Sequence, residues 1–185
     1  MPIFKSKINI NSESFIQNKS DMIRLVEKLR QIENRAATTS EKRRPRFQER
    51  GQLTPRDRIS VLLDPGMPFL EVYNMINYLV DDPKPDTSIP GATFIAGIGF
   101  INGVRCFIMV DDSGINAGAF TGKSIDKAIG CIAISLKQKL PFVHLVESAG
   151  VNLMSYTVEL WAKAGSMFQG LAKLSAAGIP TLAVL

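Results

Sequence analysis

The sequence contains few of the residues that build metal centres, disulfide scaffolds and hydrolytic triads. Its 185 residues include two cysteines and one histidine. Two cysteines are too few for a disulfide scaffold or a four-ligand zinc site, and one histidine excludes a multi-histidine metal centre. The GxSxG, GxGxxG and P-loop patterns are also missing, so neither a nucleophile-elbow hydrolase nor the common nucleotide-binding classes are supported. We therefore expect no metal site in this chain.

Long apolar runs are missing too. The sequence has no stretch of 18 or more apolar residues, and its start lacks an apolar segment followed by a small-residue cleavage site. We therefore expect no membrane span and no secretory signal peptide, and a cytoplasmic location. The remaining composition, with 45% hydrophobic and 21% charged residues, is that of a globular chain whose length suits one domain.

Positive charge is concentrated in the first third of the sequence. Residues 1–64 contain 14 Lys and Arg against 8 Asp and Glu, whereas residues 65–185 contain 8 against 9. The densest run is Lys42-Arg43-Arg44-Pro45-Arg46, followed by Arg50, Arg56 and Arg58. Such a run can bind phosphates, or it can be a solvated flexible segment. A small molecule carrying phosphates is favoured over nucleic acid, because no helix-turn-helix, RRM or zinc-finger signature accompanies the run.

Residues 1–20 are expected to be flexible and residues 21–66 to form helices around the basic run. The first helix is predicted to begin at about Asp21, with Ser20 or Asp21 as N-cap, and to end near residues 38–40. Its apolar stripe consists of Met22, Leu25, Leu29 and Ile32, widened by Val26. A second helix is predicted to begin at Thr54-Pro55, with Thr54 as N-cap and Asp57 reaching back to it.

Residues 67–185 alternate between strand and helix patterns. Strands are predicted over residues 92–100 and 105–111, joined by a hairpin at Asn102-Gly103. A helix over 124–139, a strand over 142–146, a helix over 158–177 and a strand over 180–185 follow. This order predicts an α/β fold.

Two loops of small residues follow predicted strands, Asn116-Ala117-Gly118-Ala119 and Ser148-Ala149-Gly150. Small residues let a ligand approach the main chain closely, and loops after strands are where α/β folds bind ligands. Backbone N–H groups in such loops can stabilise an oxyanion, although tight turns that bind nothing have the same composition.

Conventional catalytic side chains are scarce near these loops. His144 and Ser148 share one face of an extended segment but lie too far apart for a hydrogen bond, and His144 is interpreted as a core or interface residue. Asp111 and Asp112 are adjacent and therefore point to opposite sides of a strand. The pattern favours chemistry done by the backbone, such as stabilising a thioester enolate.

Several motifs together resemble the carboxyltransferase (β) subunits of biotin-dependent acyl-CoA carboxylases. Residues 50–59 read RGQLTPRDRI and residues 62–66 read LLDPG, where that family has RGKLTARERI and LLDPGS. Residues 110–112 lead into Ala117-Gly118, where the family usually has Gly-Gly, and residues 146–150 match its D/E-S-G-G motif. The resemblance covers about residues 23–185 and is nearest to the propionyl- and methylcrotonyl-type subunits.

The resemblance implies a crotonase-like (ClpP/crotonase) fold, with residues 67–185 forming part of the carboxyltransferase N-domain. It also implies transfer of a carboxyl group from carboxybiotin, held on a separate carrier domain, to the α-carbon of an acyl-CoA through a thioester enolate. The backbone N–H groups of Ala149 and Gly150 would form the oxyanion hole. The residues that would bind acyl-CoA are Asn116, Ala117, Gly118, Ala119 and Ser148, with Lys127, Arg46 and Arg50 as candidates for its phosphates.

The resemblance further implies partners. These are acyl-CoA, a biotin carboxylase with its biotin carboxyl carrier, and further carboxyltransferase sequence, because the family's C-domain has no counterpart in these 185 residues. We expect a homo-oligomer that binds neither nucleic acid nor membranes, and a chain that is inactive by itself.

Two alternatives remain open. The chain could be a catalytically silent relative that binds acyl-CoA or a partner subunit. It could also be a crotonase-type hydratase or isomerase, although that class has no reason to carry the RGxLTxRxRI and LLDPG motifs and needs acid and base carboxylates where only Glu147 is near. Both expected Gly-Gly pairs read Ala-Gly, and alanine costs about 1 kcal/mol wherever its position requires a positive φ.

Overall fold

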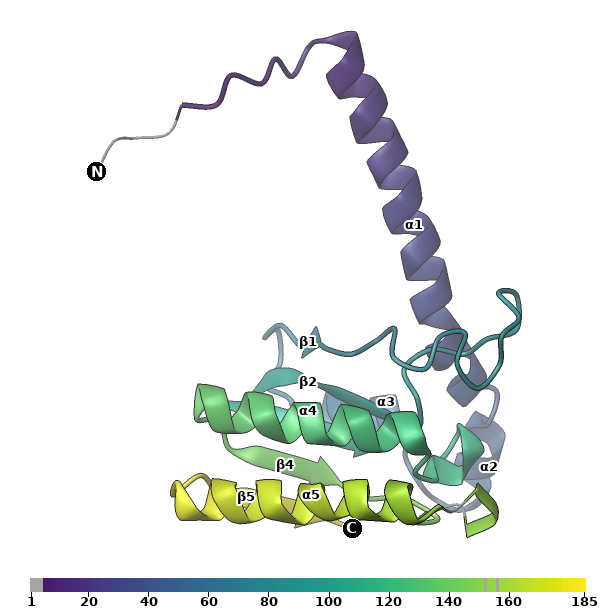
Figure 1. Ribbon diagram of the computed structural model, residues 1–185, viewed down its shortest axis with the longest axis vertical. Coiled ribbons are helices and arrows are strands. Elements are labelled where there is room, and N and C mark those ends of the chain that lie inside the picture. Colours follow the sequence, from purple (N-terminus) through teal and green to yellow (C-terminus); the bar gives the residue numbers. More distant parts are fainter. Residues whose placement is uncertain (1–4, 152, 156) are drawn as a thin grey trace.

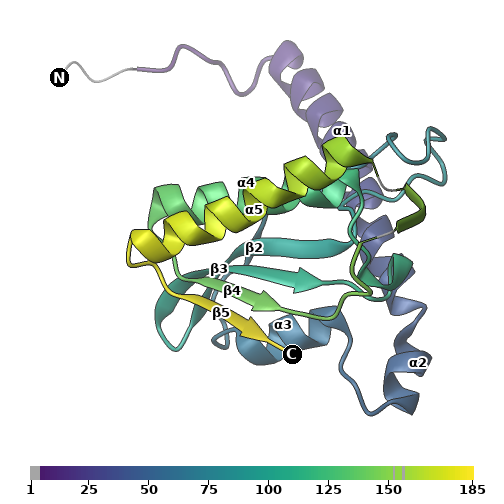
Figure 2. The same ribbon diagram turned by 60° about the horizontal axis from the view of Figure 1, so that its bottom comes forward.

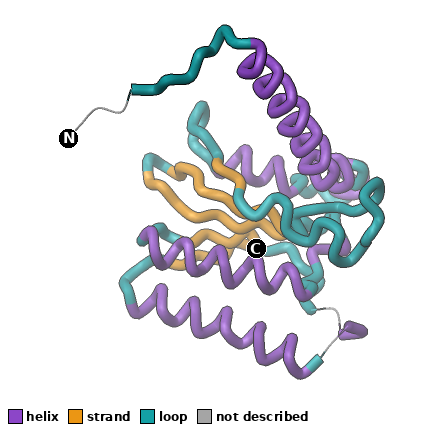
Figure 3. Tube along the Cα trace, turned by 45° about the horizontal axis from the view of Figure 1, so that its top comes forward, coloured by secondary structure: helices purple, strands orange, loops and turns teal. Residues whose placement is uncertain are grey.

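The computed structural model describes residues 5–151, 153–155 and 157–185. A five-stranded sheet forms the centre of the molecule, and helices lie on both of its faces. The first helix extends away from the sheet, as Figures 1 and 3 show. No described helix has the length and apolar character needed to cross a bilayer.

The N-terminal helix is longer than the sequence predicted. Helix α1 spans Glu13–Glu41, and the Ser12 side chain caps it by accepting a hydrogen bond from the Phe15 N–H. The prediction of a start near Asp21 is therefore wrong, and residues 13–20, which were expected to be flexible, are helical. Residues 13–20 contain no proline or glycine, and a good N-cap lets helix form ahead of the apolar stripe.

Two short helices follow α1. Helix α2 spans Arg44–Glu49 within the basic run and was not predicted, while α3 spans Pro55–Leu62 as expected. Thr54 and Asp57 form a reciprocal capping box at the start of α3. Arg44 donates to both oxygens of Asp57, at 2.7 and 3.1 Å, and these hydrogen bonds hold the pKa of Asp57 below its ordinary value. The basic run is thereby fixed to the start of α3.

The sheet has the strand order β1-β2-β3-β4-β5. Its strands are β1 (Leu70–Glu71), β2 (Phe94–Ile101), β3 (Val104–Asp111), β4 (Phe142–Leu145) and β5 (Thr181–Val184). Strands β1, β2 and β3 are antiparallel, whereas β3, β4 and β5 are parallel. The hairpin predicted at Asn102-Gly103 joins β2 to β3, and Ile101 pairs with Val104 there.

Helices α4 (Gly122–Gln138) and α5 (Val158–Ala176) connect the parallel strands and cover one face of the sheet, while α3 covers the other (Figure 2). Strand β3 supplies both cores by alternation: Phe107 and Met109 pack with α4, and Ile108 and Val110 pack with α3. Cys106 and Cys131 are buried, as expected of packing residues.

The carboxyl ends of β3, β4 and β5 lie at one edge of the sheet because these strands are parallel. The end of α1 reaches the same edge. There the buried Ser40 hydroxyl donates to Asp112 Oδ1 at 2.6 Å, and a Cβ at Gly114 would lie 2.5 Å from Ser40 Oγ. Only glycine permits this approach, which places the basic run beside the loops that leave the strands.

Candidate functional site

The two small-residue loops meet where β3 and β4 end. The Phe120 N–H donates to the Gly150 carbonyl at 2.8 Å, and the Ala149 N–H donates to the Ala117 carbonyl at 3.0 Å. The Ser148 hydroxyl donates to the Gly118 carbonyl at 2.7 Å. Three hydrogen bonds therefore join loops about 30 residues apart in the sequence into one unit.

Gly118 sits where the loops approach most closely. Its φ is +67°, and a Cβ there would lie 2.6 Å from the Glu147 carbonyl oxygen. A side chain is therefore excluded twice, by the backbone conformation and by the neighbouring loop. Ala117, which stands at the first Gly of the expected pair, has φ 52° and carries the cost of about 1 kcal/mol. Ala149 has no positive φ, so the second substitution is free of that strain.

A pocket of about 300 Å³ lies between these loops and the basic run. Of the residues predicted for the site, it is lined by Arg46, Arg50, Ala117, Ser148 and Ala149. Arg43, Phe47, Gln52, Ser113 and Glu147 complete it. The structure thus brings together five predicted residues from three distant parts of the chain.

The charge of this pocket is positive on balance. Arg43, Arg46 and Arg50 are exposed on the side formed by α2. The only acidic side chain among the lining residues is Glu147. Its carboxylate accepts from the Ser113 hydroxyl at 2.7 Å and forms an ion pair with Arg58 at 3.5 Å. Because Arg58 balances Glu147, the three arginines favour an anionic ligand.

Asp111 fixes the start of the loop that contains Ser148, Ala149 and Gly150. Its side chain is 1% exposed. One carboxylate oxygen accepts from the Glu147 N–H at 3.0 Å, and the other lies 3.1 Å from His144 Nε2. Arg58 adds hydrogen bonds to the carbonyls of Val146 and Val184. The sequence placed Asp111 only at a strand end, because its partners lie more than 30 residues away.

Four other predicted loop residues, Asn116, Gly118, Ala119 and Gly150, do not line this pocket. Asn116 lines a neighbouring polar pocket of about 250 Å³, and Arg43 lines both. In the polar pocket Asn116 is joined by Asp81, Asp82 and Ser88 from the loop before β2. Burial raises the pKa of Asp112, whose carboxylate accepts from Ser40 and from the Gly114 N–H.

Lys127 lies apart from the arginines. It is 1% exposed, and its ammonium group donates to the carbonyls of Gly91 at 3.0 Å and Phe94 at 2.5 Å. Burial lowers its pKa to about 8. The prediction that Lys127 contacts phosphates together with Arg46 and Arg50 is therefore wrong. The sequence pattern correctly predicted that Lys127 lies on a helix. Its burial depends on the packing of α4 against β2, which the sequence pattern does not reveal.

Both N–H groups expected to form an oxyanion hole already have acceptors. The Ala149 N–H is bound to the Ala117 carbonyl, as described above, and the Gly150 N–H donates to Ser148 Oγ at 3.0 Å. The first bond joins the two loops, so Ala149 is not an available donor in this conformation. The second lies within one loop, so Gly150 is the donor that a ligand can recruit once the Ser148 side chain gives up this bond and its bond to the Gly118 carbonyl.

An apolar groove of about 410 Å³ borders the same loops. Phe120 and Val151, which follow the two loops directly, form a parallel β-bridge and line one end of the groove. The rest is lined by Ile125 from α4 and by Trp161, Ala164, Gly165, Met167, Phe168 and Leu171 from α5. Within the described ranges, no group of three or more His, Cys, Asp or Glu residues could hold a metal ion.

Comparisons with known proteins define the class. Residues 46–185 match the Carboxyl transferase domain family. This match covers most of the chain, and the chain therefore belongs to that family. The fold is that of a crotonase-like carboxyltransferase.

Individual relatives narrow the similarity to β subunits of acyl-CoA carboxylases. A probable biotin-dependent acyl-coenzyme A carboxylase beta2 subunit of Mycobacterium tuberculosis is 38% identical over 76% of this chain and 25% of its own length. The mitochondrial methylcrotonoyl-CoA carboxylase beta chain of Arabidopsis thaliana is 32% identical over 99% of this chain and 31% of its own. The crystal structure of the geranyl-CoA carboxylase beta subunit of P. aeruginosa has a TM-score of 0.89 and 36% identity, covering all of this chain and 34% of that one. The chain thus spans between a quarter and about a third of the length of these three relatives.

Proposed function

We propose that this chain forms the acyl-CoA-binding part of a carboxyltransferase in a biotin-dependent acyl-CoA carboxylase. The observation that carries the proposal is the pocket in which Arg46 and Arg50 face the two strand-end loops. Acyl-CoA has phosphates at one end and a thioester at the other. A basic wall opposite loops with exposed backbone suits both ends of that molecule.

The phosphates are bound by the side of the pocket that α2 forms. Arg43, Arg46 and Arg50 are exposed there, and Arg43 borders the polar pocket as well. Guanidinium groups bind phosphate oxygens through two parallel hydrogen bonds, which gives orientation as well as affinity. Lys127 has no part in this binding because it is buried.

The acyl chain occupies the apolar groove beside α5. The groove begins at Phe120 and Val151, the residues next to the two loops, and its lining is almost wholly apolar. A thioester held at the loops would therefore direct its acyl chain into apolar surroundings, which stabilises the chain by roughly 25 cal/mol for each Å² removed from water. Ala164 and Gly165 leave room for it.

The thioester carbonyl is held by the Gly150 N–H. Ser148 Oγ releases this donor by rotating, which also breaks its own hydrogen bond to the Gly118 carbonyl, so the cost is about two neutral hydrogen bonds, roughly 2 kcal/mol. Asp111 and Arg58 both bind the peptide unit between Val146 and Glu147, so the start of the loop that carries the donor is fixed before the substrate binds. A fixed donor aimed at developing negative charge stabilises the enolate more than the ground-state thioester.

Carboxybiotin would supply the carboxyl group from a separate carrier protein. The described residues fit acyl-CoA, and we assign none of them to biotin. The proposal therefore includes further carboxyltransferase sequence, another copy of the chain, and a biotin carboxylase with its carrier as partners.

Calorimetry with the full chain tests the proposal. We expect coenzyme A and a short acyl-CoA to bind, and pantetheine, which lacks the adenosine phosphates, to bind at least tenfold more weakly. Absence of coenzyme A affinity would overturn the proposal.

A carboxylation assay separates the proposal from its alternatives. The chain is mixed with acyl-CoA, ATP, bicarbonate and a biotinylated carboxylase, with and without a co-expressed C-domain of a family member. We expect product only when the C-domain is present. Acyl-CoA binding without product in either case would favour the silent relative, and hydration of an enoyl-CoA would favour the crotonase-type hydratase.

A further inference from the structure

The apolar groove beside the two loops follows α5 away from them. Its near end is formed by Phe120 and Val151, the bridged pair that directly follows the loops. Helix α5 starts at this edge of the sheet, because it connects the carboxyl end of β4 to the parallel strand β5. The α5 residues along the groove recur at intervals of four, three and three, which places them on one face of the helix: Trp161, Gly165, Phe168 and Leu171. An acyl chain that starts at the loops would therefore run along this face.

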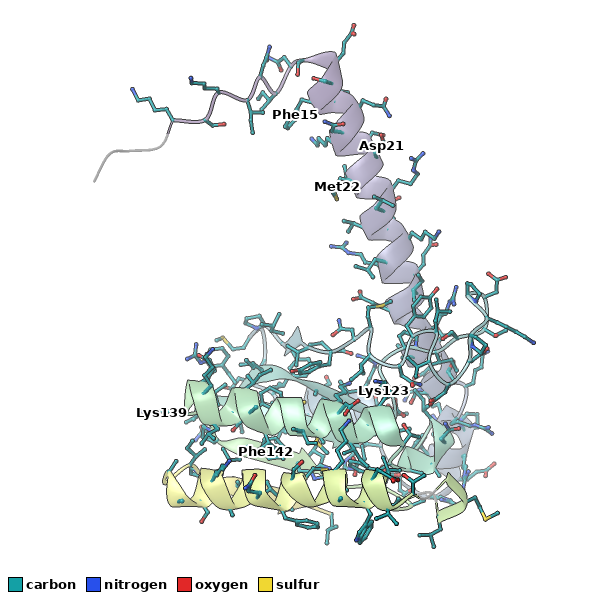
Figure 4. The ribbon with its side chains drawn as sticks, in the orientation of Figure 1. Phe15, Asp21, Met22, Lys123, Lys139 and Phe142 are labelled. Carbon is teal, nitrogen blue, oxygen red and sulfur yellow. The ribbon has the colours of Figure 1, made fainter. Side chains whose placement is uncertain are left out.

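Helix α4 forms the floor of the groove. It lies beside α5 and runs in the same direction, as Figure 4 shows, where Lys123 and Lys139 mark the two ends of α4. The starts of the two helices are close, because a Cβ at Gly122 would lie 3.7 Å from the Leu160 side chain. Ile125, which is 1% exposed, supplies the floor from α4. Among the described residues that line the groove none is charged, so its ligand is apolar along its whole length.

The groove is too large for a short acyl group. Its volume is about 410 Å³, and an apolar protein cavity of about 150 Å³ holds one benzene molecule, roughly 25 Å³ per carbon. At that density the groove holds up to about 16 carbons. From Trp161 to Leu171 it follows α5 for about 15 Å, at 1.5 Å per residue. An extended chain of about 12 carbons spans this length at roughly 1.3 Å per carbon–carbon bond.

Gly165 keeps the middle of the groove open. A Cβ at Gly165 would meet nothing within 4 Å, whereas a Cβ at Gly170 of the same helix would lie 2.8 Å from Ile132. Packing therefore requires glycine at position 170 but not at position 165. Glycine weakens the interior of a helix relative to alanine. On either side of it, Trp161 is 55% and Phe168 73% exposed, and a chain passing over Gly165 would cover both rings.

We propose that the carboxyltransferase site accepts acyl-CoA with an apolar chain of about ten to twelve carbons, and that Gly165 determines this length. The inference rests on the proposed function, because it requires coenzyme A at the basic run and the thioester at the loops. Gly165 lies four residues after Trp161, about 6 Å farther along the groove. A four-carbon chain therefore ends before Gly165, whereas a ten-carbon chain passes over it.

Calorimetry of the full chain with coenzyme A, butyryl-CoA and decanoyl-CoA tests the chain length. Complete removal of a methylene from water strengthens binding about fourfold. Because the groove is open to solvent on one side, we expect about twofold per methylene, and therefore about sixtyfold tighter binding of decanoyl-CoA than of butyryl-CoA. Equal affinities of the two acyl-CoAs, with coenzyme A still bound, would overturn this inference alone and would indicate that protein covers the groove. Absence of coenzyme A binding would overturn the proposed function as well.

Matched leucine variants test the role of Gly165. Gly165→Leu adds a side chain inside the groove, and the control Ala162→Leu adds one at an exposed position of α5 outside it. Leucine is a good helix former, and circular dichroism checks that both variants keep their helix. The quantity compared is the ratio of decanoyl-CoA affinity to coenzyme A affinity, which cancels any change at the basic run.

We expect Gly165→Leu to lower this ratio roughly tenfold or more, and Ala162→Leu to leave it within about twofold of the wild type. An unchanged or raised ratio in Gly165→Leu would overturn the proposal, because non-specific adhesion of the chain to apolar surface gives that result. Equal losses in the two variants would overturn it too, since they would show that the effect does not depend on the groove.

Discussion

The carboxylate of Asp111 holds the backbone N–H of Glu147 at 3.0 Å, and so fixes the start of the loop that carries Ser148, Ala149 and Gly150. The same carboxylate contacts His144. A single buried group on β3 therefore determines where β4 ends and where the second loop begins. The geometry of the candidate site therefore depends on the contact between Asp111 and the Glu147 N–H.

Replacing Asp111 by asparagine should loosen that loop. The amide has a single oxygen acceptor and no charge, so it binds the Glu147 N–H more weakly and cannot also accept from His144, and we expect a loss of about 2 kcal/mol in the free energy of unfolding. Amide hydrogen exchange should speed up over residues 147–150. Asp86→Asn is the control, because Asp86 is exposed in the loop before β2. Unchanged exchange in Asp111→Asn would show that this carboxylate does not position the loop.

A methyl group at Gly118 should separate the two loops. Gly118→Ala requires alanine at φ +67° and a Cβ 2.6 Å from the Glu147 carbonyl, so we expect a loss of about 2 kcal/mol or more. Gly165→Ala is the matched control. It lies inside α5 with open space at its Cβ, and alanine there should raise stability by about 0.5–1 kcal/mol. Chemical denaturation measures the free energy of unfolding of both variants. A change of the same sign in both would contradict the close approach of the two loops at Gly118.

The buried Lys127 should make stability depend on pH. Its pKa is about 8 in the folded chain and near 10.5 in an unfolded one, so between these values the unfolded state binds more protons. Stability attributable to this group should therefore rise with pH from about 8 to 10.5, by a few kcal/mol. The measurement is the difference in unfolding free energy between the wild type and Lys127→Met at each pH, which cancels the other titrating groups. A flat difference would mean that the folded pKa of Lys127 is not lowered.

Arg46 and Arg50 should give coenzyme A binding a dependence on salt. Each exposed arginine contributes up to about 1 kcal/mol, so Arg46→Gln with Arg50→Gln should weaken coenzyme A binding several-fold to about thirtyfold at low ionic strength. Added salt should weaken the wild type more than the double variant. Arg105→Gln serves as control because Arg105 is exposed at the far end of β3. Equal salt dependence in all three proteins would show that Arg46 and Arg50 do not bind the phosphates of coenzyme A.

The parts of the fold that sequence could predict are those set by local patterns. The capping box of Thr54 and Asp57, the Asn102-Gly103 hairpin and the order of strands and helices after it all depend on residues close together in the chain. Helix α2 was missed because a run of arginines around Pro45 has no apolar period. Its one buried side chain, Phe47, is the signal that could have revealed it.

The candidate site was predictable only as separate pieces. The two loops and the arginines were found by residue type and by resemblance, but their meeting depends on the Ser40–Asp112 hydrogen bond, which joins residues 72 positions apart. The misplacement of Lys127 has the same cause. A lysine on an amphipathic helix reads as a surface residue, and only the tertiary packing of α4 buries it. The hydrogen bonds that occupy the Ala149 and Gly150 N–H groups are likewise visible only in three dimensions.

An NMR titration of the ¹⁵N-labelled full chain with a short acyl-CoA tests the proposed acyl-CoA site most directly. We expect amide shifts to change over residues 113–120 and 147–151 and in α2, and the Gly150 amide, which must exchange Ser148 Oγ for the thioester oxygen, to change most. Pantetheine at the same concentration should leave α2 unchanged. Shift changes that avoid both loops, or binding with no response at Gly150, would contradict the claim that these loops and the basic run form one acyl-CoA site.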